Sequence, residues 1–579
     1  MISLKEFNPD GLLQSVAVAI FSAGLWLLMR SRKKMPGSIL DQIPGPPVSS
    51  WWKGHQSQMS DLKEGWSFHQ MLAENYGPVV KLQTVFRVSI VELLTIFIPS
   101  SSPLQRNVFY TSDPKAMNHI LLKEMNSFPP LRIEAMLDTA GEEHRKQRKM
   151  LNPVFSIAHM RSMMPMFNDI AQKLENTLKK RVENGPAEAS IDLLGWMART
   201  ALELIGQSGF GYSFDNMEDD VPKHKYSLVI KDLGPALGRL SLYNVTFLPL
   251  LCKLFSAKTR TFLMNAVPWK AVHEVRDMVM YMHEFSVKIY EEKRRALEEG
   301  DEAVMRQLGQ GKDILSILMK DNINAGAEDK LGEDEIIAQF CAAQDFLWTW
   351  ISRTFIFAAM DTTSNAMSRI LQLLTLHPDV QDKMRQEISQ ARWECQGENL
   401  SYDELVALPY LDAVCRETMR LYPPIAHIFR RAMEDSVVPL SKPVRGLDGL
   451  EITEVIVPKG TVVDISIINS NRNTDFWGPD AMEWKPERWL SSLPGSIANA
   501  KIPGVYSHLM TFNGGGRSCI GFKFSQLEMK VIISMLVEKF KFSPAPGKDI
   551  CWQMSVISSP AVLGGDGHPR LPLLVESAK

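Results

Sequence analysis

Long segments with apolar residues at helical spacing dominate the pattern of hydrophobic and polar positions along the chain. This spacing is clearest in four stretches, Asn168–Asn184, Val275–Glu299, Glu333–Leu376 and Phe522–Phe540. Between about 67 and 113 the residues alternate as in short strands, most clearly over Val79–Phe86 and Asn107–Thr111. Connections that contain Pro or Gly, at 234–249 and 265–269, are expected to interrupt the helices. The pattern predicts a mainly α fold with a smaller β-rich region.

Residues 12–29 form an uncharged, mostly apolar run, which as a helix would extend roughly 27 Å, close to the thickness of a hydrocarbon core. Four basic residues follow within 30–34, and by the positive-inside rule they keep the downstream chain cytosolic. A cleaved signal peptide is the alternative, but its charges would precede the apolar run, where Lys5 stands alone. We therefore predict a lumenal N-terminus over 1–11, a single transmembrane helix over 12–29 and a basic, proline-rich hinge over 30–50.

Composition narrows the possible classes of protein. The chain has 579 residues, of which 45% are hydrophobic, enough for one large domain over 51–579 that can bury a cofactor. A net charge of -2 gives no reason to expect nucleic acid as a partner. The 6 cysteines lack C-x-x-C spacing, so neither a zinc site nor a disulfide framework is predicted, and a reducing compartment fits.

One cysteine stands in a distinctive setting. The segment 512–521 reads FNGGGRSCIG and places Cys519 directly before the apolar segment Phe522–Phe540. Free N–H groups at a helix N-terminus favour a thiolate, which is a metal ligand. Glycines, including Gly521, would let a large flat group approach the backbone, and Arg517 could bind an anionic substituent. A lone cysteine is otherwise most often a small core residue.

Three further patterns place charged side chains on predicted helices. Each also has an ordinary interpretation, in the order given below as a solvated face, an exposed Asp beside a back-bonded Thr, and a surface ion pair. They are His144 and Arg148 at i, i+4, Asp361 and Thr362 within an otherwise apolar helix, and Glu417 and Arg420 at i, i+3 before a double proline. A carboxylate beside a hydroxyl in an apolar helix is costly to bury unless it is hydrogen-bonded, which indicates a function.

Together these motifs resemble those of the cytochrome P450 family. The chain matches F-x-x-G-x-R-x-C-x-G at 512–521, E-x-x-R at 417–420 and P-E-R at 486–488. The resemblance implies a P450 fold in which Cys519 is the axial ligand of the iron of haem b, with Phe512 and Gly521 beside it. It implies that four side chains bind the haem propionates, His144, Arg148, Arg430 and Arg517.

The resemblance also assigns the remaining motifs. Asp361 and Thr362 match A-G-x-D-T-T and would deliver protons during oxygen activation, although Ala359 stands where glycine is commonest. Glu417, Arg420 and Arg488 would form a buried network that holds the loop before Cys519. His427 has no such counterpart, and a packed or hydrogen-bonded role is the simpler reading.

The implied activity is insertion of one oxygen atom from O2 into a hydrophobic small molecule such as a terpenoid or sterol. No G-x-G-x-x-G follows a predicted strand, so electrons are expected from an NADPH-dependent cytochrome P450 reductase. The expected location is the endoplasmic reticulum membrane, in contact with lipid, with the catalytic domain cytosolic, and the motif context is most similar to fungal members of secondary metabolism. The alternatives are a reductase-independent haem-thiolate isomerase or dehydratase, and a non-catalytic haem protein.

Two stretches depart from the family pattern and are interpreted as insertions. Residues 87–105 separate two strands that the family joins by a tight turn, and they read as a membrane contact, an aggregation-prone patch or translated intron sequence. Residues 340–353 lengthen the helix that carries Asp361 by about four turns. A genuine helix extension and an artefact of the gene model are both open, and we favour the artefact.

Overall fold

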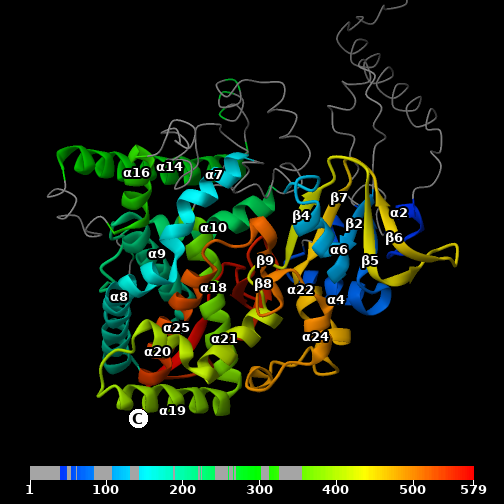
Figure 1. The fold of residues 1–579 in the computed structure, drawn as a ribbon. Coiled ribbons are helices and arrows are strands. Elements are labelled where there is room, and N and C mark those ends of the chain that lie inside the picture. Colours follow the sequence, from blue (N-terminus) through cyan, green and yellow to red (C-terminus); the bar gives the residue numbers. More distant parts are fainter. Residues whose placement is uncertain are drawn as a thin grey trace, which may run out of the picture.

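The structure is a computed structural model, and it describes residues 39–48, 54–59, 61–83, 107–130, 142–186, 190–219, 222, 224–240, 259, 262, 265, 269–300, 312–324 and 355–578. Helices form the larger part of this region and a group of sheets lies to one side of them (Figure 1). The predicted fold class, mainly helical with a smaller β-rich region, is confirmed for these residues.

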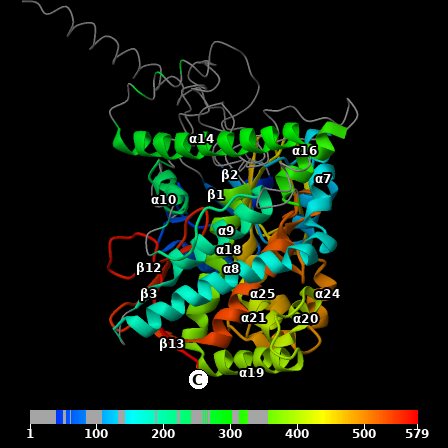
Figure 2. The ribbon, with the colours of Figure 1, turned by 90° about the vertical axis from the view of Figure 1, so that its left-hand side faces the viewer.

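Apolar stripes fold into helices that pack around α18 (Phe355–Leu376), which is surrounded by other helices in both views (Figures 1 and 2). The largest core cluster joins α18 to α8, α9, α21 and α25 through side chains such as Met367, Ile370 and Leu371. The other helices described are α2 (Ile39–Gln42), α3 (Gln56–Met59), α4 (Gly65–Tyr76), α6 (Pro114–Asn118), α7 (Glu142–Leu151), α8 (Ile157–Asn184), α9 (Leu193–Phe210), α10 (Tyr226–Arg239), α14 (Lys270–Glu299), α16 (Ile314–Asn324), α19 (Pro378–Glu394), α20 (Tyr402–Ala407), α21 (Pro409–Leu421), α22 (Ile467–Asn471), α23 (Thr474–Trp477), α24 (Gly495–Ala500) and α25 (Phe522–Lys539).

The β-rich region is built on a four-stranded sheet in the order β1-β2-β7-β4. Strands β2 and β7 pair in parallel, while β1 with β2 and β4 with β7 pair antiparallel. The strand bounds are β1 (Val79–Gln83), β2 (Asn107–Thr111), β3 (Ile191–Asp192), β4 (His427–Arg431), β5 (Ser436–Arg445), β6 (Glu451–Val457), β7 (Val462–Ser466), β8 (Gly504–Tyr506), β9 (Leu509–Gly514), β10 (Phe540–Pro544), β11 (Ile550–Gln553), β12 (Ser559–Val562) and β13 (Pro572–Ser577).

Short tight turns of helix complete the set. A π-helical turn, η2, covers His119–Lys123, and 3-10 turns cover η3 (Asn152–Phe155), η4 (Pro486–Trp489) and η5 (Gly515–Arg517). Two of these lie in motifs singled out from the sequence, η4 in P-E-R and η5 in the glycine-rich loop. Both therefore hold their motif in a compact turn and not in an open loop.

Most predicted elements are confirmed, and two predictions were wrong. Residues 67–76, read as part of a strand-forming region, belong to helix α4, because Phe68 and Leu72 are buried at a spacing of four and not of two. The predicted break at 234 is absent, since α10 runs through Gly234 and Pro235. Burial of Ile230, Leu233 and Ala236 against the core stabilises α10 despite the hydrogen bond that proline removes.

Several predictions fall on residues outside the described ones. The lumenal segment, the transmembrane helix over 12–29 and both proposed insertions, 87–105 and 340–353, lie there. Among the described residues no helix combines the length and the apolar character needed to cross a bilayer. The hinge over 30–50 is described in part; α2 ends at Gln42, and the proline-rich segment 43–47, which was expected to be incompatible with a helix, is not helical.

Candidate functional site

The loop that carries Cys519 joins β9 to α25. The backbone N–H of Cys519 donates to the Phe512 carbonyl oxygen at 2.9 Å, which closes the loop, and α25 begins at Phe522 with Gly521 as its N-cap. Phe512 is buried beneath this loop with its ring 5.3 Å from that of Tyr506, whereas the Cys519 side chain is exposed. The prediction that the sulfur stands just before a helix N-terminus is confirmed.

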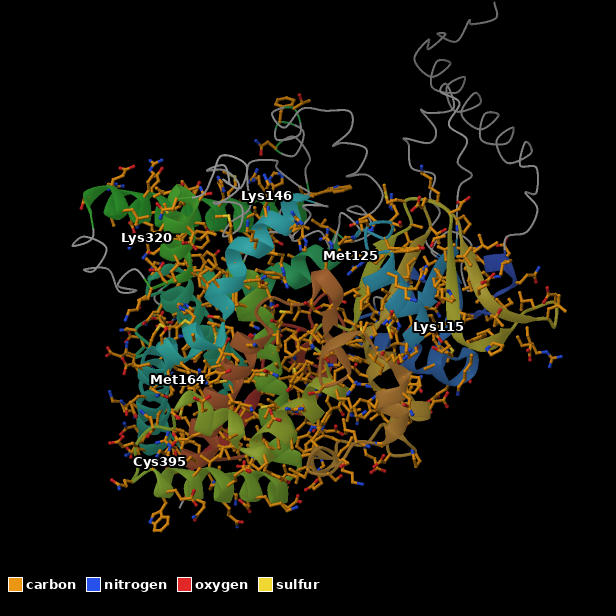
Figure 3. The ribbon with its side chains drawn as sticks, viewed as in Figure 1. Lys115, Met125, Lys146, Met164, Lys320 and Cys395 are labelled. Carbon is orange, nitrogen blue, oxygen red and sulfur yellow. The ribbon has the colours of Figure 1, made fainter. Side chains whose placement is uncertain are left out.

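Two loop glycines are required by close approach of the backbone. Gly515 has a φ of +70°, and a Cβ there would lie 2.5 Å from the Leu121 carbonyl oxygen. A Cβ on Gly516 would lie 3.0 Å from Sδ of Met125, whose position Figure 3 labels. The glycine-rich loop is therefore packed against the η2 region, and its glycines give it a fixed shape rather than flexibility.

Opposing influences act on the Cys519 thiol. Loss of solvent around the sulfur has the largest effect and raises its pKa on balance, while a hydrogen bond from the Gly521 backbone and the charge of Arg148 act to lower it. Both lowering influences act by stabilising the thiolate. A bound cation at the exposed sulfur would add a third and larger influence in the same direction.

Basic side chains from α7 gather at this loop. Arg148 donates from Nη1 to the Ser518 carbonyl oxygen at 3.0 Å, which places its guanidinium beside Cys519. His144 lies one turn earlier and is buried; burial, with the charges of Arg517 and Arg148, lowers the pKa of His144 to about 4. The predicted i, i+4 face of α7 therefore does point at the glycine-rich loop, as the separate motifs had suggested.

The residues present fit a haem with its anionic propionates. The charges of Arg148 and Arg517 disfavour a protonated His144, and the negative group that acts on Arg148 is the ionised form of Cys519. A collection of cations beside an accessible sulfur matches a flat ligand with a metal at its centre and carboxylates at its edge. The fourth predicted propionate ligand, Arg430, is 5% exposed on β4 and donates from Nη1 to the Phe429 carbonyl oxygen.

The carboxylate of Asp361 on α18 accepts hydrogen bonds from two side chains, and both reach the same oxygen. Lys231 Nζ on α10 donates to Asp361 Oδ1 at 2.5 Å and to Ser364 Oγ at 2.8 Å. One turn further along α18, Asn365 Nδ2 donates to the same Oδ1 at 3.2 Å. Asp361 is 7% exposed, so its charge is balanced by a buried ion pair.

Thr362 and Thr363 point their hydroxyls in different directions. Thr362 Oγ1 donates back to the Ala358 carbonyl oxygen at 2.6 Å, one turn earlier, and its side chain is partly exposed. Such a back-bond leaves the hydroxyl oxygen able to accept a hydrogen bond. Thr363 Oγ1 instead reaches Ser525 Oγ on α25 at 3.4 Å, which ties α18 to the helix that follows Cys519.

One buried network contains Glu417, Arg420 and Arg488. The ordinary interpretation of Glu417 and Arg420 as a surface ion pair is therefore wrong. Arg420 binds both carboxylate oxygens of Glu417, at 2.8 and 2.7 Å, and both side chains are fully buried. Arg488 approaches Glu417 Oε1 at 3.4 Å and also binds Asp480 Oδ1 at 2.9 Å. Arg420 Nη1 donates to the carbonyl oxygens of Asn471 and Ala481, so the network fixes the chain that leads to the Cys519 loop.

Sequence reasoning missed Lys231 and Trp489. Trp489 Nε1 donates to Glu417 Oε2 at 2.9 Å, and its position directly after P-E-R was a usable signal. Lys231 lies 130 residues before Asp361 on a helix without a recognisable motif, so no local pattern marks it. His427 is hydrogen-bonded to Asp464 Oδ1 at 3.1 Å, in agreement with its simpler reading.

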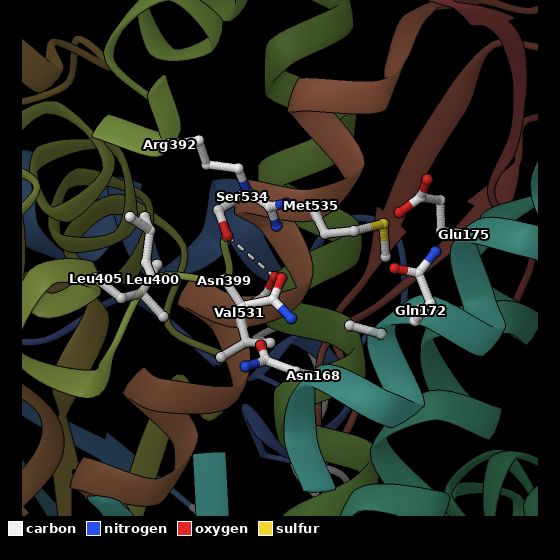
Figure 4. A pocket seen from close by; sticks show the side chains of 11 residues that line it. Asn168, Gln172, Glu175, Arg392, Asn399, Leu400, Leu405, Val531, Ser534 and Met535 are labelled. Atoms are coloured by element: carbon white, nitrogen blue, oxygen red, sulfur yellow. Dashed lines mark hydrogen bonds between the residues drawn. The ribbon is translucent and has the colours of Figure 1, made fainter. Parts of the chain in front are cut away.

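A separate hollow lies between α8, α19 and α25 (Figure 4). Polar and apolar groups line it, among them Asn168, Glu175, Arg392, Ser534 and Met535. It contains none of the predicted site residues. The candidate site is therefore the region of Cys519 and Asp361 and not this hollow.

Comparisons with known proteins agree with this site. The sequence model of the cytochrome P450 family matches residues 44–561. Cytochrome P450 monooxygenase 91 of Postia placenta is 46% identical over 566 residues, which cover 96% of this chain and 97% of that protein. The ganoderic acid synthetase CYP5150L8 of Ganoderma lucidum is 41% identical over 581 residues, with coverage of 98% and 99%. The chain belongs to the cytochrome P450 family, and it is a monooxygenase of that family, for which a haem cofactor is implied.

Proposed function

We propose that this protein is a haem b monooxygenase that inserts one atom of O2 into a hydrophobic small molecule. The observation that carries the proposal is the exposed sulfur of Cys519 at a helix N-terminus, faced by the basic side chains of α7. Cys519 would hold the iron, and His144, Arg148, Arg430 and Arg517 would bind the propionates. When bound, the haem supplies the redox chemistry of oxygen activation.

The protein's own residues supply protons and orientation. The carboxylate of Asp361 forms an ion pair with Lys231, and it can accept or donate a proton when that pair opens. The Thr362 hydroxyl, whose proton is donated to Ala358, presents an oxygen that can accept from a reacting group. Burial of Asp361 restricts water, which limits proton transfer to groups that these side chains position.

We further propose that electrons come from an NADPH-dependent cytochrome P450 reductase. Membrane anchorage by residues 12–29 and an endoplasmic reticulum location with a cytosolic catalytic domain belong to the same proposal. They rest on the apolar run followed by basic residues. An anchored reductase and an anchored monooxygenase would meet by diffusion within one membrane.

The proposed substrate class is terpenoid or sterol. The support is the 41% identity to a protein named ganoderic acid synthetase. A reductase-independent isomerase or dehydratase needs no proton delivery, so the held Asp361–Lys231 pair favours the monooxygenase. A haem protein made non-catalytic by the stretches 87–105 and 340–353 is the second alternative.

Reconstitution tests the proposal directly. The full chain would be combined with a fungal reductase, NADPH and a panel of triterpenoids and sterols under isotopically labelled O2. The expected product carries one labelled oxygen atom and forms only when NADPH is present. A product without the label, or one that forms without NADPH, would support the isomerase or dehydratase instead.

A further inference from the structure

A small cavity lies against α18 on the face that carries Asp361. Asn365 and Arg369 from α18, Trp66 from α4, Tyr422 from the turn after α21, Trp552 from β11 and Ser558 line it. The space open to the centre of a water molecule is about 10 Å³, close to the smallest cavity that holds one water. Asp361, Asn365 and Arg369 follow one another at i, i+4 and i+8, so the cavity continues the same helix face.

Three polar atoms of the lining have no hydrogen-bond partner among the described residues. They are Asn365 Oδ1, Arg369 Nε and Ser558 Oγ. Asn365 is 1% exposed and Ser558 is 3% exposed, so bulk water does not satisfy them. Leaving one such buried polar group without a hydrogen-bond partner costs about 1–3 kcal/mol. Three such groups at one cavity would therefore be unfavourable unless a further molecule bonds to them.

The donors and acceptors at the cavity match one water molecule. Arg369 Nε–H can donate, Asn365 Oδ1 can accept, and the Ser558 hydroxyl can do either. Buried waters typically make about three hydrogen bonds, and this is the number available. The orientation of the Asn365 amide is fixed, because its Nδ2 donates to the carbonyl oxygen and the carboxylate of Asp361.

An anion fits the cavity less well than water. The Arg369 guanidinium is stacked between Tyr422 and Trp552, 3.9 and 4.0 Å from the ring centroids, and it would attract an anion. Burial and the charge of Arg472 lower the pKa of Arg369 to about 9, while Tyr422 raises it. The Asn365 carbonyl oxygen, however, would face the anion with its own partial negative charge, whereas water can donate to it.

We propose that this cavity is an ordered-water site and that Asn365 is a positioning residue through which the water orients Asp361. The water would hold one end of the Asn365 amide, and the other end of the amide donates to Asp361 Oδ1, the oxygen that also accepts from Lys231. Asp361 is thereby aligned by two donors. The link to catalysis rests on the proposed monooxygenase function, but the water site itself does not.

Two experiments on the haem-loaded full chain test the proposal. A crystal structure is expected to show a water within about 2.7–3.2 Å of Asn365 Oδ1, Arg369 Nε and Ser558 Oγ. A dry cavity overturns the site, and so does an anomalous peak there after a bromide soak. This readout does not depend on turnover.

The second experiment compares Ser558→Ala with Ser555→Ala, a control in the same loop whose hydroxyl binds the Ile557 carbonyl oxygen. Loss of one hydrogen bond to the water is expected to raise the hydrogen peroxide released per NADPH about two- to tenfold and to alter its pH profile. The control is expected to behave as wild type. If Ser558→Ala retains the thiolate spectrum and an unchanged peroxide ratio, the positioning role is wrong. Loss of oxygenation in the wild type would instead count against the proposed function.

Discussion

Replacement of Glu417 by glutamine should destabilise the protein strongly although it exchanges only one oxygen atom for an NH2 group. The carboxylate accepts from Arg420 at both oxygens, from Trp489 Nε1 and from the Lys485 backbone N–H. Whichever oxygen becomes an NH2 group, at least two donors then face a donor. Removing the charge also leaves the guanidinium of Arg420, which is fully buried, without its anion. Breaking a buried ion pair costs about 3–5 kcal/mol.

Equilibrium unfolding in urea, followed by tryptophan fluorescence, measures this loss in the free energy of unfolding. The matched control is Glu487→Gln in the adjacent η4 turn, whose carboxylate is 41% exposed and binds Lys383 and Tyr410. The control should cost about 1 kcal/mol or less, because exposed pairs contribute little. A Glu417→Gln protein within about 1 kcal/mol of wild type would refute the claim that burial makes this network structural.

Three further predictions concern α18, the glycine-rich loop and His69, which is buried on α4. Lys231→Met should increase the hydrogen peroxide released per NADPH and change the solvent isotope effect on that release, because the ion pair of Asp361 is lost. Lys231→Arg should restore both values to those of the wild type. Wild-type values in Lys231→Met would contradict the role given to this ion pair. Gly515→Ala should abolish haem incorporation, measured by absorbance. Gly547 has a φ of +66° and open space around it, so Gly547→Ala should lower the free energy of unfolding by only about 1–2 kcal/mol and leave haem incorporation intact. Equal losses of haem in the two variants would show that the space available to the new Cβ is not decisive. Burial and the charge of His427 lower the pKa of His69 well below 6.5, so the unfolded chain binds the extra proton and stability should fall as pH drops through 6.5. From pH 7.5 to 5.5 His69 contributes about 1.4 kcal/mol to the loss of stability, and in urea titrations His69→Gln should reduce the loss by that amount; an unchanged slope argues against a neutral buried His69.

Local patterns predicted those parts of the site in which neighbouring residues act together. The link from Cys519 to Phe512 and the pair of Glu417 with Arg420 span a few residues, so a motif records them. Helices at 168–184 and 275–299 were expected for the same reason, although α8 and α14 extend further toward the N-terminus. The spacing of apolar residues predicts which face of a helix is buried better than it predicts the residue at which the helix begins.

Contacts between distant segments could not be predicted in this way. Lys231 meets Asp361 only because α10 crosses α18 in the folded chain. The water cavity likewise unites α4, α18 and the region after β11, and no short pattern contains residues from all of them. Helix α10 continues past Pro235 because its packed face compensates for the lost hydrogen bond, a tertiary effect that overrides a local signal.

Coordination of haem iron by Cys519 is the central claim, and one spectrum tests it. The dithionite-reduced holoprotein is mixed with carbon monoxide, and the Soret band is recorded for wild type and for Cys519→Ser. The wild type should show the strongly red-shifted band of a thiolate ligand, and the serine variant should lack it. The same red-shifted band in the serine variant would show that another side chain holds the iron.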